Sequence, residues 1–200
     1  DMGEVSEVRP AVFRAGIVKH EDQIYGVLLK GMPGGVHSVV SAEGADTVEL
    51  AVAVPKSFAE LSGLGPGDRM LTYFVGGRMT VRRFNIVDTY ESGADPDGRF
   101  LVYADIEDMR RLNGWKQDEA SMLEVLLADS YRDEESMESV AAEIGFIMNT
   151  YASEDDDALV SVSAVSRYPQ VFGWLSLIDF NVFFILLLMI IVAGFNMISG

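Results

Sequence analysis

The sequence predicts an α+β protein, with a two-lobed water-soluble part of mixed β-sheets and short helices followed by one membrane-spanning helix. Three observations predict this arrangement. Segments that alternate apolar and polar residues recur up to about residue 90, as expected of half-buried strands. From about residue 95, strand-like segments alternate with helix-like segments. Residues 180–200 are almost wholly apolar and carry no charge.

The apolar stretch at the carboxyl end decides the class of protein. It just reaches the roughly 20 residues that a helix needs to cross the hydrocarbon core of a bilayer. Eleven of the fourteen residues from Val182 to Phe195 are Val, Ile, Leu or Phe. Each of these favours insertion by about 0.3–0.6 kcal/mol, so together they contribute about 3–7 kcal/mol. A buried core helix is the alternative, but helices in globular proteins usually have a polar stripe on the face that meets water, which this stretch lacks. The residues expected to mark the span are Phe180, Val182, Leu187, Ile190, Phe195 and Asn196.

Asn196 is the one strongly polar residue between Val182 and Gly200 in the predicted span. It either faces a neighbouring helix within the bilayer or lies at the far headgroup level, and the sequence leaves both open. Gly194 and Gly200 are too far apart for a GxxxG dimerisation motif.

Residues 168–179 are predicted to form a juxtamembrane helix that lies near the membrane surface. Tyr168 and Trp174 stand where an interfacial aromatic belt would be. Asp179 is expected to cap the first turn of the span. These three residues are therefore the predicted coupling points between the outer part and the membrane helix.

Charge and composition exclude several classes. The net charge is −16, with 15 Lys and Arg against 31 Asp and Glu, whereas nucleic-acid binding needs a basic footprint. The chain has no cysteine, so disulfides, thiol catalysis and Cys-based zinc sites are excluded. The first residue is not Met and the sequence stops at the end of its apolar stretch, so we expect a fragment of a longer membrane protein.

The soluble part, residues 1–167, is divided by the change of pattern near residue 95. A hairpin-rich lobe is expected over about 36–94 and a strand–helix lobe over about 95–167. The firmest prediction in the first lobe is a hairpin, with Arg69–Val75 and Met79–Tyr90 joined at Gly76-Gly77. The other expected strands are 3–30 (two strands separated at His20–Gln23), 36–40, 48–54, 100–104, 121–128 and 159–165. The expected helices are 56–61, 105–112 (capped by Asp105 and ended by Gly114) and 133–151.

Candidate catalytic and metal-binding groups all have simpler interpretations. His20 and His37 lack the spacing of a zinc site. The run Glu154–Asp157 could collect Ca²⁺, but a solvated loop accounts for it better. Residues 95–98 begin like a calcium loop but lack its remaining ligands, so a β-turn is the better account. Gly63, Gly65 and Gly67 are not followed by the GK[ST] of a phosphate loop. No GxSxG elbow occurs. The sequence therefore predicts no catalytic residue, metal ligand or cofactor.

The string VPKSFAELSGLGPGDRMLTYF resembles a signature in the extracytoplasmic domain of type VII ABC-transporter permeases, the FtsX/MacB-like family. Five residues carry it: Ala59, Leu61, Leu64, Gly67 and Asp68. VRRFNIVDTYESG, VYADIEDMRRLNGW and the stretch from YPQVFGW to the end follow in the order that this family shows. The resemblance extends over about 7–200 and is closest to the lipoprotein-releasing (LolC/LolE-like) branch.

The resemblance implies that residues 1–167 are a MacB-like extracytoplasmic domain, that 180–200 are the second membrane helix, and that ATP is hydrolysed on a separate subunit. It also implies a bacterial inner-membrane location with 1–167 on the periplasmic side. Arg167, the sole basic residue just before the span, agrees weakly with that orientation. The implied partners are a cytoplasmic ABC ATPase, a second permease subunit, and a lipoprotein or its periplasmic carrier.

Two functions from different classes are compatible with the sequence. One is a permease subunit that releases lipoproteins by mechanotransmission, with efflux or control of cell-wall hydrolases possible in the same family. The other is a membrane-anchored extracytoplasmic binding or sensory domain without an ATPase. A membrane-tethered hydrolase is the weakest, because no nucleophile–base pair is visible.

Overall fold

The computed structural model describes residues 3–41, 48–75, 79–92, 99–151 and 159–199. It divides the chain into two compact units. One unit is 5–126, and the other comprises 1–4 with 127–200. Strands and helices occur together, so the predicted α+β class is confirmed.

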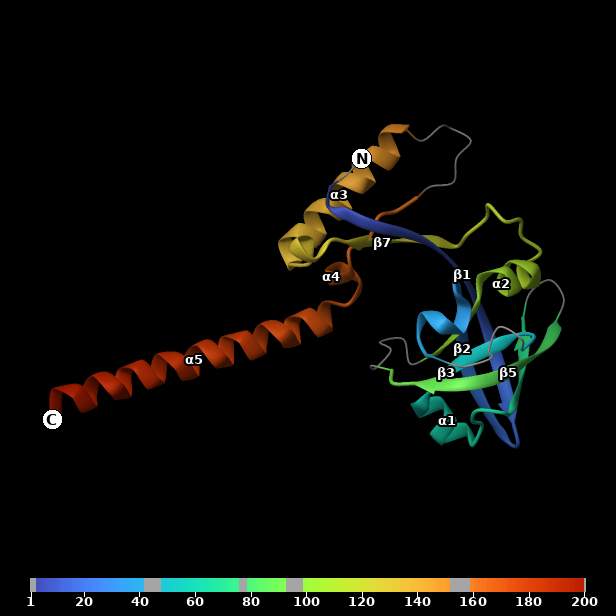
Figure 1. Ribbon diagram of the computed structural model, residues 1–200, viewed down its shortest axis with the longest axis horizontal. Helices are drawn as coiled ribbons and strands as arrows, with labels where there is room; N and C mark the ends of the chain where they lie inside the picture. Colours follow the sequence, from blue (N-terminus) through green and yellow to red (C-terminus); the bar gives the residue numbers. More distant parts are fainter. Residues whose placement is uncertain (1–2, 42–47, 76–78, 93–98, 152–158, 200) are drawn as a thin grey trace. The chain divides into compact units, whose positions relative to one another are not determined.

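The first unit is a ring of strands (Figure 1). Hydrogen-bonded neighbours follow the order β2-β6-β3-β5-β4-β1, and β1 pairs again with β2, so these six strands close on themselves. A closed sheet has no free strand edge within the ring. β7 pairs with the remaining part of β1. The strands are β1 Val5–His20, β2 Gln23–Met32, β3 Ala51–Pro55, β4 Arg69–Phe74, β5 Thr80–Tyr90, β6 Phe100–Asp105 and β7 Met122–Leu127.

Alternation of side chains explains where the core lies. In β4, Met70, Thr72 and Phe74 are buried while the residues between them are half-buried or exposed, because successive side chains of a strand point to opposite faces. β3 is buried at every position, since the short 3-10 helix η1 (Gly35–Ser38) and residues of neighbouring strands cover its outer side. The inner faces form one hydrophobic core of Val12, Val18, Val27, Leu29, Val52, Val54, Phe58, Leu64, Met70, Phe74, Phe84, Ile86, Val102, Ala104, Ile106 and Met109.

Two helices pack on this core at opposite ends of β2. α1 (Lys56–Ser62) inserts Phe58, which meets Tyr25 edge-on at 5.6 Å between ring centroids. α2 (Ile106–Asn113) places Met109 against Gly31. As predicted, Asp105 caps α2 by accepting a hydrogen bond from Glu107 N at 2.8 Å, and Gly114 ends it in the left-handed conformation.

The predicted hairpin is confirmed, because β4 and β5 pair antiparallel from Arg69↔Asn85 to Phe74↔Thr80. Its turn at Gly76-Gly77, and the turn expected at 95–98, lie outside the described residues. The strand expected at 36–40 is wrong. η1 replaces it, because Gly34 and Gly35 adopt left-handed backbone angles (φ 80° and 53°) that redirect the chain.

The structure also differs from the two predicted lobes. β6 lies beyond the expected boundary at residue 95, yet it pairs parallel with β2 and antiparallel with β3 in the same ring. The division between the units lies instead at Leu126/Leu127. The boundary depends on which strands pair across long sequence separations. A change of local pattern along the chain carries no information about that pairing, so it did not predict the boundary.

The second unit is helical in its described part. It contains the short 3-10 helix η3 (Asp129–Tyr131), α3 (Glu134–Tyr151), α4 (Ala164–Arg167) and α5 (Pro169–Ser199). The helix expected at 133–151 is confirmed as α3, and Val140 is its one buried residue among those that the structure describes. The strand expected at 159–165 is wrong: residues 159–163 have no ladder partner among the described residues, and 164–167 are helical.

Candidate functional sites: an apolar helix and a cleft

α5 is one unbroken helix of 31 residues, drawn in red in Figure 1. At 1.5 Å per residue it is about 46 Å long, whereas the hydrocarbon core of a bilayer is about 30 Å thick. Residues 169–195 are long and apolar enough to cross a membrane, and none of the most apolar part is buried. A helix that is apolar all round and uncovered has no stable place in water. The geometry therefore fits a membrane span with additional turns at its amino-terminal end.

The residues predicted to mark the span all lie on α5. Each of those whose side chain the structure describes is exposed, with Phe180 at 62% and Ile190 at 69%. A core helix would be covered by the rest of the chain, so this exposure favours the predicted span over the core-helix alternative. Asn196 also belongs to α5, but its side chain lies outside the described residues, so its two interpretations remain predictions.

The junction before the span differs from the prediction. Tyr168 is the C-cap residue of α4, and α5 begins directly after it at Pro169. Asp179 lies inside α5 and caps nothing, because the helix continues through it from Trp174 to the predicted span. The reason is that proline is well tolerated in a first turn, and the one weak helix former that follows, Gly173, costs a helix only about 1 kcal/mol. One rigid helix thus replaces the surface helix and separate span that were expected.

A helix-capping interaction occurs at the start of α4, the short helix that precedes α5. Ser163 caps α4: its hydroxyl oxygen accepts a hydrogen bond from Ser166 N at 3.0 Å and lies 3.1 Å from the Ser166 hydroxyl. Tyr168 N then donates to Ala164 O at 2.9 Å. The short α4 turn is therefore hydrogen-bonded at both ends immediately before α5 begins.

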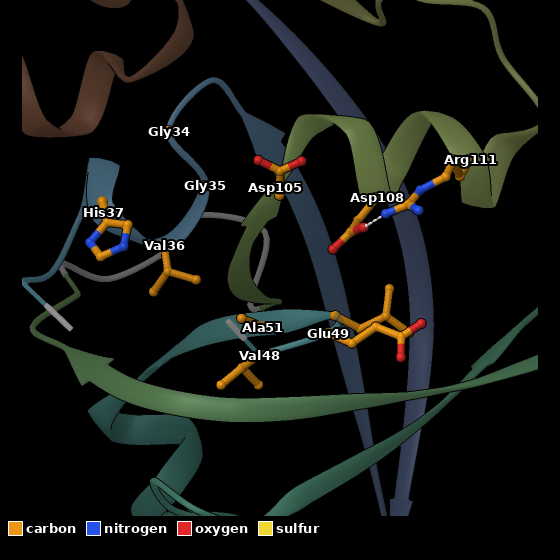
Figure 2. Close-up of a pocket in the computed structure, with 11 residues that line it drawn as sticks. Gly34, Gly35, Val36, His37, Val48, Glu49, Ala51, Asp105, Asp108 and Arg111 are labelled. Atoms are coloured by element: carbon orange, nitrogen blue, oxygen red, sulfur yellow. Dashed lines mark hydrogen bonds and ion pairs between the residues drawn. The ribbon is translucent and has the colours of Figure 1, made fainter. Parts of the chain in front are cut away.

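A cleft of about 550 Å³ lies in the first unit, beside the amino terminus of α2 (Figure 2). Its wall is the left-handed turn Gly34-Gly35, and a Cβ on Gly35 would stand 3.3 Å from both Cα and Cβ of Asp105. Only glycine permits both this backbone conformation and this approach. The lining residues are Gly34, Gly35, Val36, His37, Val48, Glu49, Leu50, Ala51, Asp105, Asp108 and Arg111.

Most of the charged groups that line this cleft form ion pairs or hydrogen bonds that stabilise α2. Asp108 pairs with Arg111 one turn along α2, and Asp105 is committed to capping the same helix. Glu49 is exposed at the rim. The described residues contain no cluster of three or more His, Cys, Asp or Glu that could hold a metal ion. The cleft can accept a small polar group, but its side chains do not form a nucleophile–base pair.

Sequence reasoning did not find this cleft. Glu49 and the α2 pair Asp108–Arg111 come from two separate segments that only the folded ring of strands brings together, so no spacing in the sequence indicates the cleft. The one available signal is the run MPGG at 32–35, whose Pro and Gly residues favour a turn or loop. Of the two histidines, His37 lines the cleft and His20 ends β1. The acidic run at 154–157 lies outside the described residues.

The pKa shifts of Asp133 and Arg14, both outside α5, have identifiable physical causes. The pKa of Asp133 is lowered because its carboxylate accepts hydrogen bonds from the Ser136 side chain and backbone N–H at the start of α3. Burial lowers the pKa of Arg14, and nearby Arg82 adds to the effect. The Arg14 guanidinium donates to Leu112 O and to Asn113 Oδ1 (3.0 Å) and lies 4.7 Å from the centre of the Phe74 ring. Both groups support structure rather than a site.

Comparison with known proteins gives matches only among solved structures. No protein-family model and no curated protein matches the chain. The extracellular domain of the noncanonic ABC-type transporter YknZ from Gram-positive bacteria is 14% identical, with a TM-score of 0.47 over 74% of this chain and 76% of that one. The periplasmic region of MacB from Actinobacillus actinomycetemcomitans is 12% identical, with a TM-score of 0.42 over 74% and 70%. A domain of a protein named as a permease, from Porphyromonas gingivalis, is 14% identical, with a TM-score of 0.41 over 78% and 68%. These three do not single out the lipoprotein-releasing branch.

Proposed function

We propose that this chain is the outer domain and one membrane-spanning helix of an ABC-transporter permease, and that the permease releases lipoproteins from the bacterial inner membrane. The observation that carries the proposal is α5, a continuous helix whose apolar side chains are uncovered. The order of the permease-like strings from Ala59 to the carboxyl end supports the same assignment. Residues 1–167 would lie on the periplasmic side.

In this proposal the chain acts mechanically. ATP is bound and hydrolysed on a separate cytoplasmic subunit, and this chain carries no catalytic residue or cofactor. A helix transmits displacement along its axis because every turn is hydrogen-bonded to the next. α5 runs without interruption from Pro169 through Trp174 and Asp179 to the span. A movement of the membrane segment would therefore reach Tyr168 at the edge of the outer domain.

The proposed partners follow from this role. A cytoplasmic ABC ATPase supplies the driving force, and a second permease subunit, identical or different, completes the membrane part. A lipoprotein or its periplasmic carrier contacts the outer domain. Efflux of small molecules or control of cell-wall hydrolases would use the same mechanics with another cargo.

A second candidate is a membrane-anchored binding or sensory domain without an ATPase. The cleft beside α2 favours it, because a pocket of this size can hold a small ligand without any mechanical cycle. The two candidates differ in what accompanies the full-length protein in the membrane. Three further spans and an ATPase accompany the first, whereas a single span suffices for the second.

The experiment compares two insertions after Gly173 in the full-length protein, assembled with its ATPase in lipid vesicles. A Gly-Ser-Gly-Ser insertion interrupts the helix, whereas Glu-Ala-Ala-Lys lengthens it by about one turn and keeps it helical. We expect the flexible insertion to abolish ATP-dependent release of a vesicle-bound lipoprotein while ATP hydrolysis continues, and the helical insertion to retain most release. Equal release by both variants would refute coupling through α5. Failure of any ATPase to purify with the protein would favour the second candidate.

A further inference from the structure

The outer face of three neighbouring strands combines apolar and basic side chains in an otherwise acidic protein. Ile17 of β1 lies opposite Tyr73 of β4, and Tyr73 lies opposite Val81 of β5, so the three form one row across the sheet. Lys19, Arg69 and Arg83 lie on the same face of the same strands, because each is an even number of residues from a member of the row. We name these six residues the β1–β4–β5 face.

The row is not part of the hydrophobic core. The intervening residues Val18, Thr72 and Phe84 point inward and are buried, so the core is complete without the outer row. Ile17 and Val81 remain 39% and 38% exposed. Val75 and Met79, at the hairpin end of the same strands, are 72% and 70% exposed. A contiguous apolar surface of this kind on a water-soluble unit is typical of a contact site.

In the part of the chain that the structure describes, the cations on this face lack the carboxylate partners that several cations elsewhere have. Lys19, Arg69 and Arg83 form no ion pair with any residue that the structure describes, whereas Lys30, Lys56, Arg110 and Arg111 are each paired with a carboxylate. The outward positions of 15–19, 69–73 and 81–85 contain no Asp or Glu, although the chain has 31 acids against 15 bases. Three cations without an ion-pair partner among the described residues thus border the apolar row.

We propose that the β1–β4–β5 face is a docking surface for a partner protein that presents carboxylates beside aliphatic or aromatic side chains. The apolar row supplies the buried centre of such an interface and the three cations its rim. The net charge of −16 repels an acidic partner at a distance, but at physiological salt this repulsion is screened beyond about 8 Å. Local complementarity then decides the contact. The face belongs to a closed ring, so the partner packs on side chains rather than adding a strand.

The proposal goes beyond the function proposed above, since it assigns a binding face and requires no ATPase. The full-length protein is expressed in its native host with the photocrosslinking residue p-benzoylphenylalanine in place of Val81 or, separately, Ile17. The control carries it at Leu61, which is 64% exposed on α1. We expect one protein to be captured from both positions on the face and not from the control. Its crosslinked peptide should contain more Asp and Glu than Lys and Arg.

The captured protein is then purified and its binding to the full-length chain in detergent is measured. The double variant Lys19→Glu/Arg83→Glu should weaken binding roughly tenfold or more, and added salt should weaken binding of the unaltered chain. The control Lys56→Glu/Lys116→Glu changes the net charge equally and should bind normally. The idea is overturned by crosslinks to lipid or to a second copy of this chain, by a basic crosslinked peptide, by no capture, or by equal weakening in both double variants.

Discussion

Gly31 on β2 packs directly against Met109 on α2: a Cβ on Gly31 would stand 2.7 Å from Met109 Cγ and 2.8 Å from Met109 Cβ. The same Cβ would lie 3.1 Å from the Ile106 backbone, so the helix cannot simply rotate its side chain away. This contact fixes how closely α2 approaches the ring of strands. It also holds Asp105 and Asp108 at the edge of the cleft.

Gly31→Ala is therefore expected to destabilise the first unit by about 1–3 kcal/mol, the usual cost of overpacking a core. Urea unfolding of the detergent-solubilised chain, followed by Trp115 fluorescence in a Trp174→Phe background, measures the change. Gly26→Ala is the matched control on the same strand, because its nearest neighbour is Arg99 Cγ at 4.0 Å. Equal stability of the two variants would contradict close packing of α2 on β2.

Loss of the Asp105 cap should also destabilise α2. Asp105→Ala removes the acceptor for Glu107 N and is expected to cost about 0.5–2 kcal/mol. Asp105→Asn keeps an acceptor oxygen and should retain most of the stability. The same unfolding measurement separates the two, and an equal loss in both would show that charge rather than capping matters at this position.

The amino-terminal turn of α3 should depend on pH through Asp133. Its pKa is lowered in the folded state, so the stabilisation is complete above the unfolded pKa of about 3.9 and is lost as the pH falls through the lower folded value. Hydrogen exchange of the first amides of α3 should therefore accelerate below about pH 4 relative to the rest of the helix. Asp133→Asn should lose this dependence, and an unchanged profile in that variant would assign it to another group.

Membrane insertion of α5 should fail when two charges enter its centre. Leu187→Arg and Ile190→Arg together cost about 5–7 kcal/mol and remove two favourable residues, which cancels the 3–7 kcal/mol that the apolar stretch supplies. Carbonate extraction should then release the variant from membranes. Leu175→Arg with Gln170→Arg places the same charges in the first turns of α5 and should leave the protein anchored. Retention of the central double variant would argue against a span at this position.

Local signals predicted local structure well. Asp105 and Gly114 bound α2 as expected, and the alternation in 69–90 gave the β4–β5 hairpin. The strand expected at 159–165 shows the limit of such signals, because alternation describes a possible strand but does not supply a partner for its backbone. The β-branched residues of 36–40 favour a strand. The left-handed backbone angles of Gly34 and Gly35 instead direct the chain into the helix η1.

Features that depend on distant contacts could not be predicted. The ring closes through β1–β2, β2–β6 and β6–β3 pairs, and β2 and β6 are far apart in the sequence. The cleft and the β1–β4–β5 face exist only because of this closure. The long apolar helix could be predicted, since its length and composition belong to one segment. The continuity of α5 through Asp179 could not be predicted, because an acidic residue is compatible both with the start of a helix and with its interior.

The pairing of β1 with β7 has a mechanical consequence. The chain enters the first unit at Val5 and leaves it at Leu126, and these ends are neighbours: Ser6 Oγ donates to Leu126 O, while Ser121 N donates to Ala11 O. The two strands therefore run in opposite directions from a shared end. Tension applied to both ends would break the hydrogen bonds between β1 and β7 one after another, starting at Val5 and Leu126, before it acted on the ring. The β1–β7 pair would therefore shield the ring of strands from such tension.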